Sequence, residues 1–576
     1  MERGRAAGPP VRAGEFVRRA GSVLLLDGKP FRFHGNNVYY NQADIVYGRT
    51  AGVAETFDKM ASLGMTVVRA NAHNDHPPTS DPAAIQTEPG VLVESSLVAL
   101  DRSIAMARER SIRLILKLTN NWEAYGGIRR YVQWHLGRAP QQNEWGLFYT
   151  EERIRGWYKS YARAIIERRN TVTGVLYRDE PAILAWELGN ELRNPSGGRA
   201  DALVAWHAEM AAFIKSIDAN HLVADGGEGF DDNAVLYAGL SNRYSVAGSE
   251  GCSYHRLAKI PEIDMLSYHL YPSSWGLNDG ADTELFIRRH EEIARENGKV
   301  AYLGEYGKRA ADAERAVVFE GWLKRTVDVE ASAGAMLWHL INDSKGDSEG
   351  YQLYCPQHSV SCGLMQRYSE KLELAPALVS AASFRAGAVA AGSLATMFLP
   401  RPLDDAAGMR VTVGGRDATA FLLSAAQINF LVPAETPDGG SVVRVMRGGD
   451  VVASAVMTIA RSAPGVFMVD GKAVGQAVVV DASGARREQS LFDTPVAIPR
   501  GASAVLVLYG TGVRGAKGWS ATIGGREAAV LYAGPQGEFA GLDQINVAVP
   551  EGVAGVVDVI VRADGESANA VKVEIK

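Results

Sequence analysis

Eight short runs rich in Val, Ile and Leu alternate with longer amphipathic stretches over about 350 residues of the chain. This pattern is typical of parallel strands in a sheet that helices cover on both faces, because such strands are buried on both sides and are therefore apolar throughout. Eight strand–helix units predict a (β/α)8 barrel with long loops, and a doubly wound open sheet is the alternative. The expected strands are residues 31–40, 66–72, 113–120, 183–191, 221–227, 263–272, 300–307 and 334–341.

The stretches between these runs have the periodicity of helices with one buried face. Leu97, Leu100, Ile104 and Ala107, for example, recur at three- and four-residue spacing. Helices are expected at residues 53–64, 97–111, 152–170, 200–217 and 284–298.

The sequence pattern changes after about residue 385. Helical periodicity fades there, and short strand-like runs rich in Val and Ala, separated by glycines, replace it. Residues 411–435 recur as residues 521–552 with one insertion, and each copy has GGR before an acid, then QIN and VP. The repeat predicts two β-sandwiches. They resemble paired immunoglobulin-like modules of bacterial extracellular proteins. We expect a flexible N-terminal segment, a barrel domain and two sandwich modules at residues 1–20, 21–380, 381–465 and 466–576.

Composition excludes several classes of protein. The net charge of −6 and the pI of about 6.1 give no electrostatic reason to bind nucleic acid or an anionic membrane. No apolar run approaches the roughly 20 residues that span a bilayer. The N-terminus lacks the apolar segment of a signal peptide, so either the protein stays inside the cell or an export signal is missing from this chain.

Metal and cysteine chemistry are weakly indicated. No Cys/His spacing resembles a zinc site, and the densest group of possible ligands is HNDHP, residues 73–77. We expect no metal and no cofactor. Cys355 and Cys362 could form a small disulfide or remain two thiols.

Polar side chains fall where the expected strands end, and in a barrel such side chains converge on one cleft. The fourth and seventh strands end in Glu191 and Glu305. These strands lie nearly opposite each other in an eight-strand ring, so the two carboxylates are predicted to face across the cleft. The other polar residues at these ends are Arg69, Asn120, Asn121, Trp122, Asn190, His269, Tyr271 and Trp338.

Two carboxyl groups in this arrangement can cleave a glycosidic bond, because one protonates the leaving oxygen while the other attacks the anomeric carbon. Glu305 should be ionised to attack, a state favoured by Arg69 and by a hydrogen bond from Tyr271. Glu191 should be protonated first, so we expect apolar surroundings or the Glu305 charge to raise its pKa. The side chains suited to hold the sugar, by an amide and by flat apolar faces, are Asn190, Trp122 and Trp338.

The same strand ends resemble glycoside hydrolase family 5. The matching motifs are AWELGNELR, SYHLYP, LGEYG and MLWHL, and residues 118–135, 169–191 and 209–230 resemble its endo-β-1,4-mannanase branch. The resemblance covers residues 22–367 and implies a (β/α)8 barrel, retention of anomeric configuration and hydrolysis of internal β-1,4-mannosidic bonds in mannan-type polysaccharides. It implies that Glu191 is the acid/base and Glu305 the nucleophile. The residues that it places around the scissile sugar are Arg69, Asn190, His269, Tyr271 and Trp338.

The chain departs from this branch at several positions. It has NELR where NEPR is usual and EYG where EFG is usual. Relatives commonly place a tryptophan two residues after the arginine, where this chain has Asn71. Loss of that aromatic face would weaken one sugar subsite by about 1–3 kcal/mol, which affects substrate preference and leaves the reaction type unchanged.

We therefore expect a monomeric, extracellular endo-β-mannanase that takes polysaccharide or oligosaccharide substrates. The alternative is the same chemistry on cellulose, another β-glucan or short oligosaccharides. A barrel that binds carbohydrate without cleaving it would be expected to lack one strand-end Glu, and both are present. For the C-terminal modules we rank a spacer or structural support above carbohydrate binding, because neither repeat has a run of Trp and Tyr.

Overall fold

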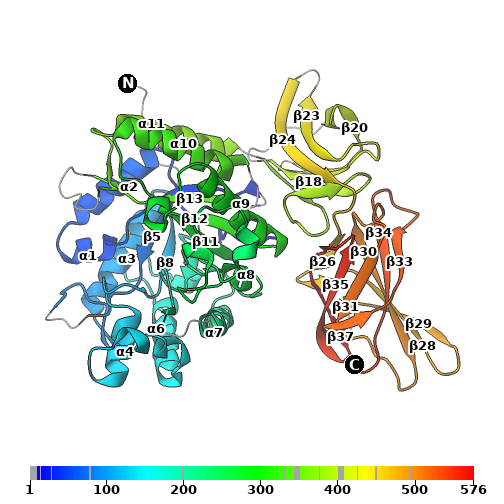
Figure 1. The fold of residues 1–576 in the computed structure, drawn as a ribbon, viewed down its shortest axis with the longest axis horizontal. Helices are drawn as coiled ribbons and strands as arrows, with labels where there is room; N and C mark the ends of the chain where they lie inside the picture. Colours follow the sequence, from blue (N-terminus) through cyan, green and yellow to red (C-terminus); the bar gives the residue numbers. More distant parts are fainter. Residues whose placement is uncertain are drawn as a thin grey trace.

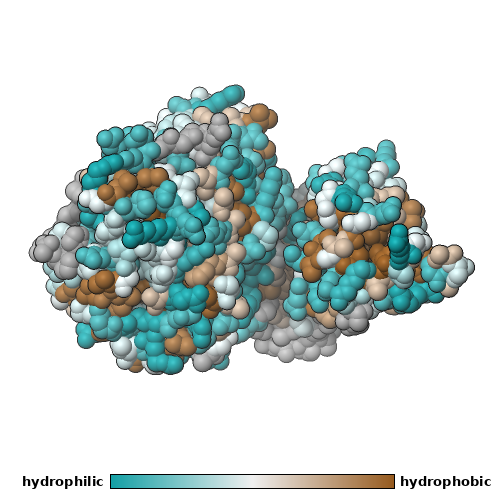
Figure 2. All heavy atoms as spheres, turned by 90° about the horizontal axis from the view of Figure 1, so that it is seen from below, coloured by the Kyte–Doolittle hydropathy of each residue, from teal (hydrophilic) through white to brown (hydrophobic). Residues whose placement is uncertain are grey.

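The protein consists of a barrel at one end and two β-sandwiches at the other (Figure 1). The computed structural model describes residues 10–12, 14–27, 29–76, 80–195, 200–328, 332–342, 350–374, 376–399, 408–424, 426–447, 450–492 and 495–576. Seen from below, apolar residues form a patch on the sandwiches (Figure 2). Among the described helices, none combines the length and the apolar character needed to cross a bilayer.

Eight parallel strands close into a barrel in chain order. Each overlaps one of the expected runs, so the predicted (β/α)8 barrel is confirmed and the doubly wound alternative is wrong. The strands are β4 (Phe33–Asn37), β5 (Val67–Asn71), β8 (Arg113–Lys117), β9 (Ile183–Glu187), β10 (Leu222–Ala224), β11 (Met265–Leu270), β12 (Val300–Tyr306) and β13 (Ser332–Leu337).

Helices surround the barrel (Figure 1). The stripe predicted from Leu97, Leu100, Ile104 and Ala107 is buried against the strands. The helices are α1 (Asn41–Val46), α2 (Thr50–Ser62), α3 (Glu94–Glu109), α4 (Ile128–Leu136), α5 (Leu147–Thr150), α6 (Glu152–Ile166), α7 (Asp201–Ile217), α8 (Tyr254–Leu257), α9 (Ala281–Glu296), α10 (Asp312–Asp328) and α11 (Ser359–Leu374). Two short pairs lie in the loops, β6 (Gln86–Glu88) with β7 (Val91–Leu92), and β14 (Leu340–Ile341) with β15 (Leu353–Tyr354).

Apolar side chains fill the amino-terminal half of the barrel. Val67, Ile115 and Met336 belong to a buried cluster that also contains Leu24. Leu24 lies on the small sheet of β1 (Arg18–Ala20), β2 (Val23–Leu26) and β3 (Lys29–Pro30), which therefore packs against this end of the barrel. Residues 1–9 and 13 of the N-terminal segment expected to be flexible lie outside the described residues, whereas β1 within that segment is paired. Polar groups are left to the carboxyl ends of the strands.

The C-terminal half forms two sandwiches with separate apolar cores. The sheets of the first are β16-β18-β22-β21 and β17-β24-β23-β19-β20, and those of the second are β29-β28-β30-β34-β33 and β26-β27-β37-β35-β31-β32. The strands are β16 (Ala377–Ser380), β17 (Ala388–Ala390), β18 (Leu394–Phe398), β19 (Met409–Val413), β20 (Arg416–Ala418), β21 (Ala420–Leu423), β22 (Gln427–Leu431), β23 (Gly439–Arg447), β24 (Asp450–Ala460), β25 (Gly465–Val466), β26 (Met468–Val469), β27 (Lys472–Ala473), β28 (Gly475–Val480), β29 (Arg486–Ser490), β30 (Ser503–Thr511), β31 (Trp519–Ile523), β32 (Arg526–Ala528), β33 (Val530–Pro535), β34 (Asp543–Ala548), β35 (Gly555–Ala563), β36 (Glu566–Ser567) and β37 (Val571–Ile575).

The first sandwich packs against the barrel. Phe398 on β18 and Val379 on β16 form a buried cluster with Val23 of β2. The backbone N–H of Ser22 also donates to the carbonyl of Phe384 at 3.2 Å. The sandwich therefore covers apolar side chains of the small sheet at the amino-terminal end of the barrel.

Candidate active site

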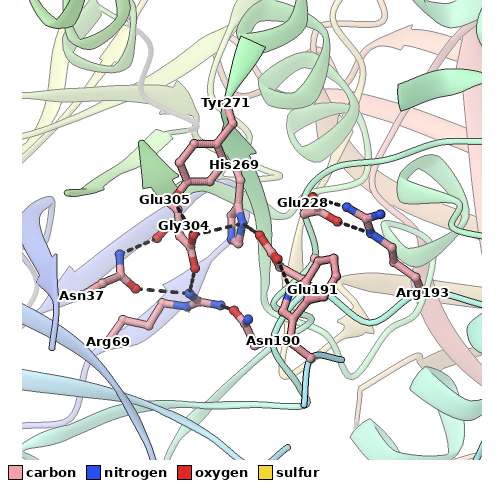
Figure 3. A network of polar contacts seen from close by, with 12 residues as sticks. Asn37, Arg69, Asn190, Glu191, Arg193, Glu228, His269, Tyr271, Gly304 and Glu305 are labelled. Atoms are coloured by element: carbon pink, nitrogen blue, oxygen red, sulfur yellow. Dashed lines mark hydrogen bonds and ion pairs between the residues drawn. The ribbon is translucent and has the colours of Figure 1, made fainter. Parts of the chain in front are cut away.

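A buried guanidinium joins three strands of the barrel. Arg69 on β5 has no solvent-exposed surface and donates two hydrogen bonds to Glu187 on β9, at 2.8 Å from Nε and 2.6 Å from Nη2. Its Nη1 donates to Glu305 on β12 at 2.6 Å. Its remaining contacts are with the side-chain oxygens of Asn190 (2.6 Å) and Asn37 (3.2 Å). Arg69 thus fixes the position of Glu305 relative to Asn190 (Figure 3).

Glu191 and Glu305 meet as the sequence predicts. One carboxylate oxygen of each lies within 4.8 Å of the other, and both side chains are largely buried. His269 lies between them, with Nδ1 2.6 Å from Glu191 Oε1 and 3.7 Å from Glu305 Oε2 (Figure 3). The Tyr271 hydroxyl donates to Glu305 Oε2 at 2.7 Å, which confirms the predicted contact.

The backbone has an unusual feature at each glutamate, a positive φ at Glu191 and a closely packed glycine just before Glu305. Glu191 has a φ of 53°, a left-handed conformation that a long side chain seldom adopts and that tertiary contacts must maintain. Its N–H donates to the carbonyl of Gly226 at 2.9 Å. A Cβ on Gly304 would lie 2.9 Å from His269 Nε2 and 2.4 Å from Ser267 Oγ. Glycine before Glu305 therefore leaves the space that the His269 ring occupies.

The two carboxylates are held in different ways. Burial alone would raise the pKa of Glu191, but hydrogen bonds from His269 and Trp122 and the positive charge of His269 lower that pKa to about 2. The expectation of a raised Glu191 pKa is therefore wrong for the enzyme without substrate. Burial tends to lower the pKa of His269, yet Glu305 and Glu191 outweigh it and raise that pKa. The two shifts act in the same sense, because each favours the charged form of its group, imidazolium for His269 and carboxylate for Glu191.

Aromatic rings border the pair of carboxylates. Trp122 donates from Nε1 to Glu191 Oε2 at 2.5 Å, and the guanidinium of Arg193 lies 5.1 Å from its ring centre. Trp338 stacks on Tyr39 with ring centres 5.0 Å apart and planes at 5°. Each ring therefore has a neighbour against one face.

Two predicted residues have partners within the protein. Asn190 donates from Nδ2 to Asn120 Oδ1 at 3.0 Å, in addition to accepting from Arg69. Asn121 is buried, and its Oδ1 accepts from the backbone N–H of Arg193 at 3.3 Å. Asn121 therefore holds the turn that carries Glu191, and none of its contacts among the described residues is with Glu305.

Charged residues that sequence reasoning missed complete the site. Glu187 is bound by Arg69 and by the Tyr302 hydroxyl at 2.8 Å. Glu228 forms a two-point ion pair with Arg193 at 2.7 and 2.8 Å, while burial and the nearby Glu191 charge raise its pKa to about 7. Glu187 could have been recognised as an acid inside an apolar strand, whereas Glu228 lies in a loop with no such signal.

Lys117, also missed, lies beside the unusual Asn71. The two residues are paired in register on β8 and β5, and Lys117 is buried. Its Nζ lies 5.8 Å from the centre of the Tyr39 ring. Burial lowers the pKa of Lys117 to about 7, and Arg69 acts in the same direction. An amine thus lies next to the position where an aromatic ring was expected.

Among the residues that the structure describes, two groups of side chains have the spacing of metal ligands, Glu191 with His269 and Glu305, and Asp231 with Asp232 and His255. One pair in each group is hydrogen-bonded, since His269 Nδ1 lies 2.6 Å from Glu191 Oε1 and His255 Nδ1 lies 2.6 Å from Asp231 Oδ1. His73 and Asp75 of the HNDHP motif are 3.8 Å apart and belong to neither group.

Residues 14–326 match the family model described as GH family 5 beta-mannosidase-like. The chain belongs to glycoside hydrolase family 5. It is 35% identical over 384 residues to the putative mannan endo-1,4-beta-mannosidase 5 of Oryza sativa subsp. japonica, a match covering 62% of this chain and 76% of that protein. It is 31% identical to mannan endo-1,4-beta-mannosidase 7 of Arabidopsis thaliana, covering 63% and 86%.

Solved structures of endo-mannanases are also similar. An endo-1,4-beta-D-mannanase from Thermotoga petrophila RKU-1 has a TM-score of 0.54 and 33% identity, with 59% of this chain and 99% of that chain covered. An endo-1,4-beta-mannanase from Rhizomucor miehei has a TM-score of 0.55 and 30% identity, covering 62% and 99%.

The Arg69 network yields a stability prediction. Arg69→Met leaves Glu187 buried without its cation, so we expect the free energy of unfolding to fall by about 3–5 kcal/mol. Adding Glu187→Gln should restore part of this loss, because the uncompensated charge is removed. Guanidinium unfolding followed by tryptophan fluorescence measures both variants. A loss below about 1 kcal/mol, or no recovery in the double variant, would contradict this account.

Lys117 yields a prediction of pH dependence. Between pH 7 and the ordinary lysine pKa of 10.5, the unfolded chain holds a proton that the folded protein does not, so stability rises with pH across this window. Lys117→Met removes the cost of burying the amine and should raise the barrel's Tm most below pH 7 and least above pH 10. Calorimetry across this range tests the trend, with the exposed Lys572→Met as the matched control. A gain independent of pH would refute it.

Proposed function

We propose that this family 5 enzyme is a retaining endo-β-1,4-mannanase, with Glu305 as nucleophile and Glu191 as acid/base. The observation that supports retention most directly is the distance of at most 4.8 Å between carboxylate oxygens of the two glutamates. Retaining enzymes have carboxyl groups about 5–5.5 Å apart, whereas inverting enzymes need about 6.5–9.5 Å to admit a water. The mannanase names of its relatives in rice and Arabidopsis support the choice of substrate.

In the first step, Glu305 attacks the anomeric carbon and forms a glycosyl ester while the bond to the leaving sugar breaks. Arg69 and Tyr271 each donate a hydrogen bond to one Glu305 oxygen, which orients the carboxylate. The leaving oxygen takes a proton from Glu191. In the second step Glu191 accepts a proton from water, and that water displaces Glu305 from the sugar with net retention.

The proton for the first step comes from the His269–Glu191 pair. In the free enzyme the pair rests as His269 protonated and Glu191 ionised, with Nδ1 and Oε1 2.6 Å apart. A bound sugar displaces water from Glu191, which favours its neutral form, so the proton moves from Nδ1 to Oε1 and the neutral carboxyl then passes a proton to the glycosidic oxygen. Trp122 supports the other Glu191 oxygen throughout.

Substrate contacts follow from the surrounding residues. Trp338 and Trp122 present ring faces to the sugar, and Asn190 is placed by Arg69 for a hydrogen bond to a hydroxyl beside the anomeric carbon. Asn121 supports the Glu191 turn. Because Asn71 and Lys117 offer amide and amine groups where an aromatic ring was expected, the subsite beside them favours hydroxyl contacts over stacking.

We also propose that the sandwiches are immunoglobulin-like, with the first beginning at Ala377 and the second at Gly465. β16 supports the first boundary, because it lies within the range expected for the barrel yet pairs with β18. The first sandwich acts as structural support for the barrel. The disulfide between Cys355 and Cys362 supports an extracellular location, since such bonds persist in oxidising compartments.

Glu191→Gln and Glu305→Gln test the assignment. Each substitution keeps the side-chain shape and removes the proton donor or the nucleophile, so we expect hydrolysis of mannan to fall by at least about 10³-fold with the circular dichroism spectrum unchanged. Lys308→Gln, outside the described contacts of either glutamate, is the control. Full activity in either glutamate variant would end the two-carboxylate account.

The substrate and stereochemistry need their own measurements. A screen on mannan, glucomannan, cellulose and mannobiose should give the fastest cleavage on the mannan polymers. NMR of the newly released reducing ends should show the β-anomer first. Preference for cellulose would move the assignment to another β-glycan, and early α-anomer would exclude retention.

A further inference from the structure

The QIN motif of the internal repeat lies outside the barrel, and the structure places it on one face of each sandwich. In the second sandwich, Gln544 and Asn546 are partly exposed while Ile545 between them is buried. Gln544 Nε2 donates to Asn546 Oδ1 at 2.9 Å. Gln427 and Asn429 make the same contact at 2.9 Å in the first sandwich. The two modules therefore carry an equivalent polar pair on equivalent sheets.

The face beside this pair is covered in the first sandwich. β18 places Phe398 opposite Gln427, and Phe398 is only 2% exposed because it packs on Val23 of the barrel. At the other end of the strand, the N–H of Leu394 donates to Thr511 Oγ1 of the second sandwich at 2.9 Å. This face is an internal contact of the chain.

The equivalent face of the second sandwich is open. β30 places Tyr509 opposite Gln544 and Val507 opposite Asn546, and β28 places Gln476 beside Val507. The face contains a groove of about 290 Å³. Its floor and walls include Gln476, Val505, Val507, Tyr509, Gln544 and Asn546.

The chemistry of the open face differs from that of the covered one. Tyr509 stands where the first sandwich has Phe398, and Gln476 stands where it has Val379. Within the described part of the chain, neither the Gln476 amide nor the Tyr509 hydroxyl has a hydrogen-bond partner. These changes replace an apolar packing surface with groups that donate and accept hydrogen bonds beside a valine floor.

The charge of the groove selects among ligands. Its cation, Arg486, is paired with Glu488 at 2.8 Å, and the other groups named above are amides, a phenol and valines. Such a surface offers no net positive charge to an anionic polymer. Amides and a phenol over an apolar floor instead match a neutral chain of sugars, whose hydroxyls and C–H faces alternate.

We propose that the groove formed by Gln476, Tyr509, Gln544 and Asn546 binds the neutral polysaccharide that the barrel cleaves. The choice of polymer rests on the proposed mannanase function, whereas the location and chemistry of the groove do not. The first sandwich would then support the barrel while the second holds the chain on its substrate. For the second module this differs from the sequence analysis, which ranks a spacer or structural support above carbohydrate binding.

Binding to insoluble linear β-1,4-mannan tests the proposal. The full chain is used with Glu305→Gln so that the polymer is not degraded, and the bound fraction is measured after centrifugation. Tyr509→Ala and, separately, Gln476→Ala should weaken binding by about tenfold, because each removes a contact without altering the buried core. Trp519→Ala is the matched control, since Trp519 is an exposed aromatic (40%) on the opposite sheet of the same module.

Activity assays on the chain with Glu305 intact distinguish this proposal from the proposed catalytic function. Tyr509→Ala should leave hydrolysis of soluble mannotetraose unchanged and slow the release of sugar from insoluble mannan. Failure of wild type to cleave any mannan would instead reject the proposed function, and the binding assay repeated on cellulose and xylan would then test the groove independently.

Two results would overturn the proposal. The first is equal binding by wild type, Tyr509→Ala and Gln476→Ala to every neutral polymer tested. The second is a change in molecular mass by light scattering in Tyr509→Ala with unchanged polymer binding, which would show that the face takes a second copy of this chain.

Discussion

The buried guanidinium of Arg69 is the interaction on which the geometry of the site depends. Burying this positive charge away from solvent costs free energy unless a negative charge lies beside it. Glu187 provides that charge and accepts two hydrogen bonds from the guanidinium. Its remaining donors reach Glu305 and Asn190, so one charged group sets the relative positions of residues from β5, β9 and β12. The apolar side chains packed in the amino-terminal half of the barrel support this arrangement from below the strand ends.

The second constraint is the position of His269 between two carboxylates. It lies closer to Glu191 than to Glu305, at 2.6 Å against 3.7 Å, whereas Glu305 is held by Arg69 and Tyr271. Chemically identical side chains therefore have different partners, one beside a proton donor and the other beside a permanent cation. This difference in partners suits the two roles proposed for the carboxyl groups, acid/base for Glu191 and nucleophile for Glu305.

Much of the fold could be predicted from sequence because each barrel strand is a short apolar run that ends in polar residues. The meeting of Glu191 and Glu305 followed from strand order alone. The pKa of Glu191 could not be predicted, since it depends on His269 and Trp122 approaching from other strands. Glu228 and Lys117 were missed for the same reason, because their surroundings are built by residues distant in sequence. The QIN motifs of the two repeats are identical, so the sequence does not show that the face beside the motif is covered in the first sandwich and open in the second. That difference depends on packing.

The central claim is that Glu305 attacks the sugar, and trapping the covalent intermediate tests it most directly. A 2-deoxy-2-fluoro mannobiosyl fluoride slows hydrolysis of the glycosyl ester, so mass spectrometry can locate the sugar after proteolysis. The account predicts one added disaccharide per chain, attached to the peptide that contains Glu305. Attachment to Glu191, or continued turnover of the fluoride with no covalent species, would contradict it.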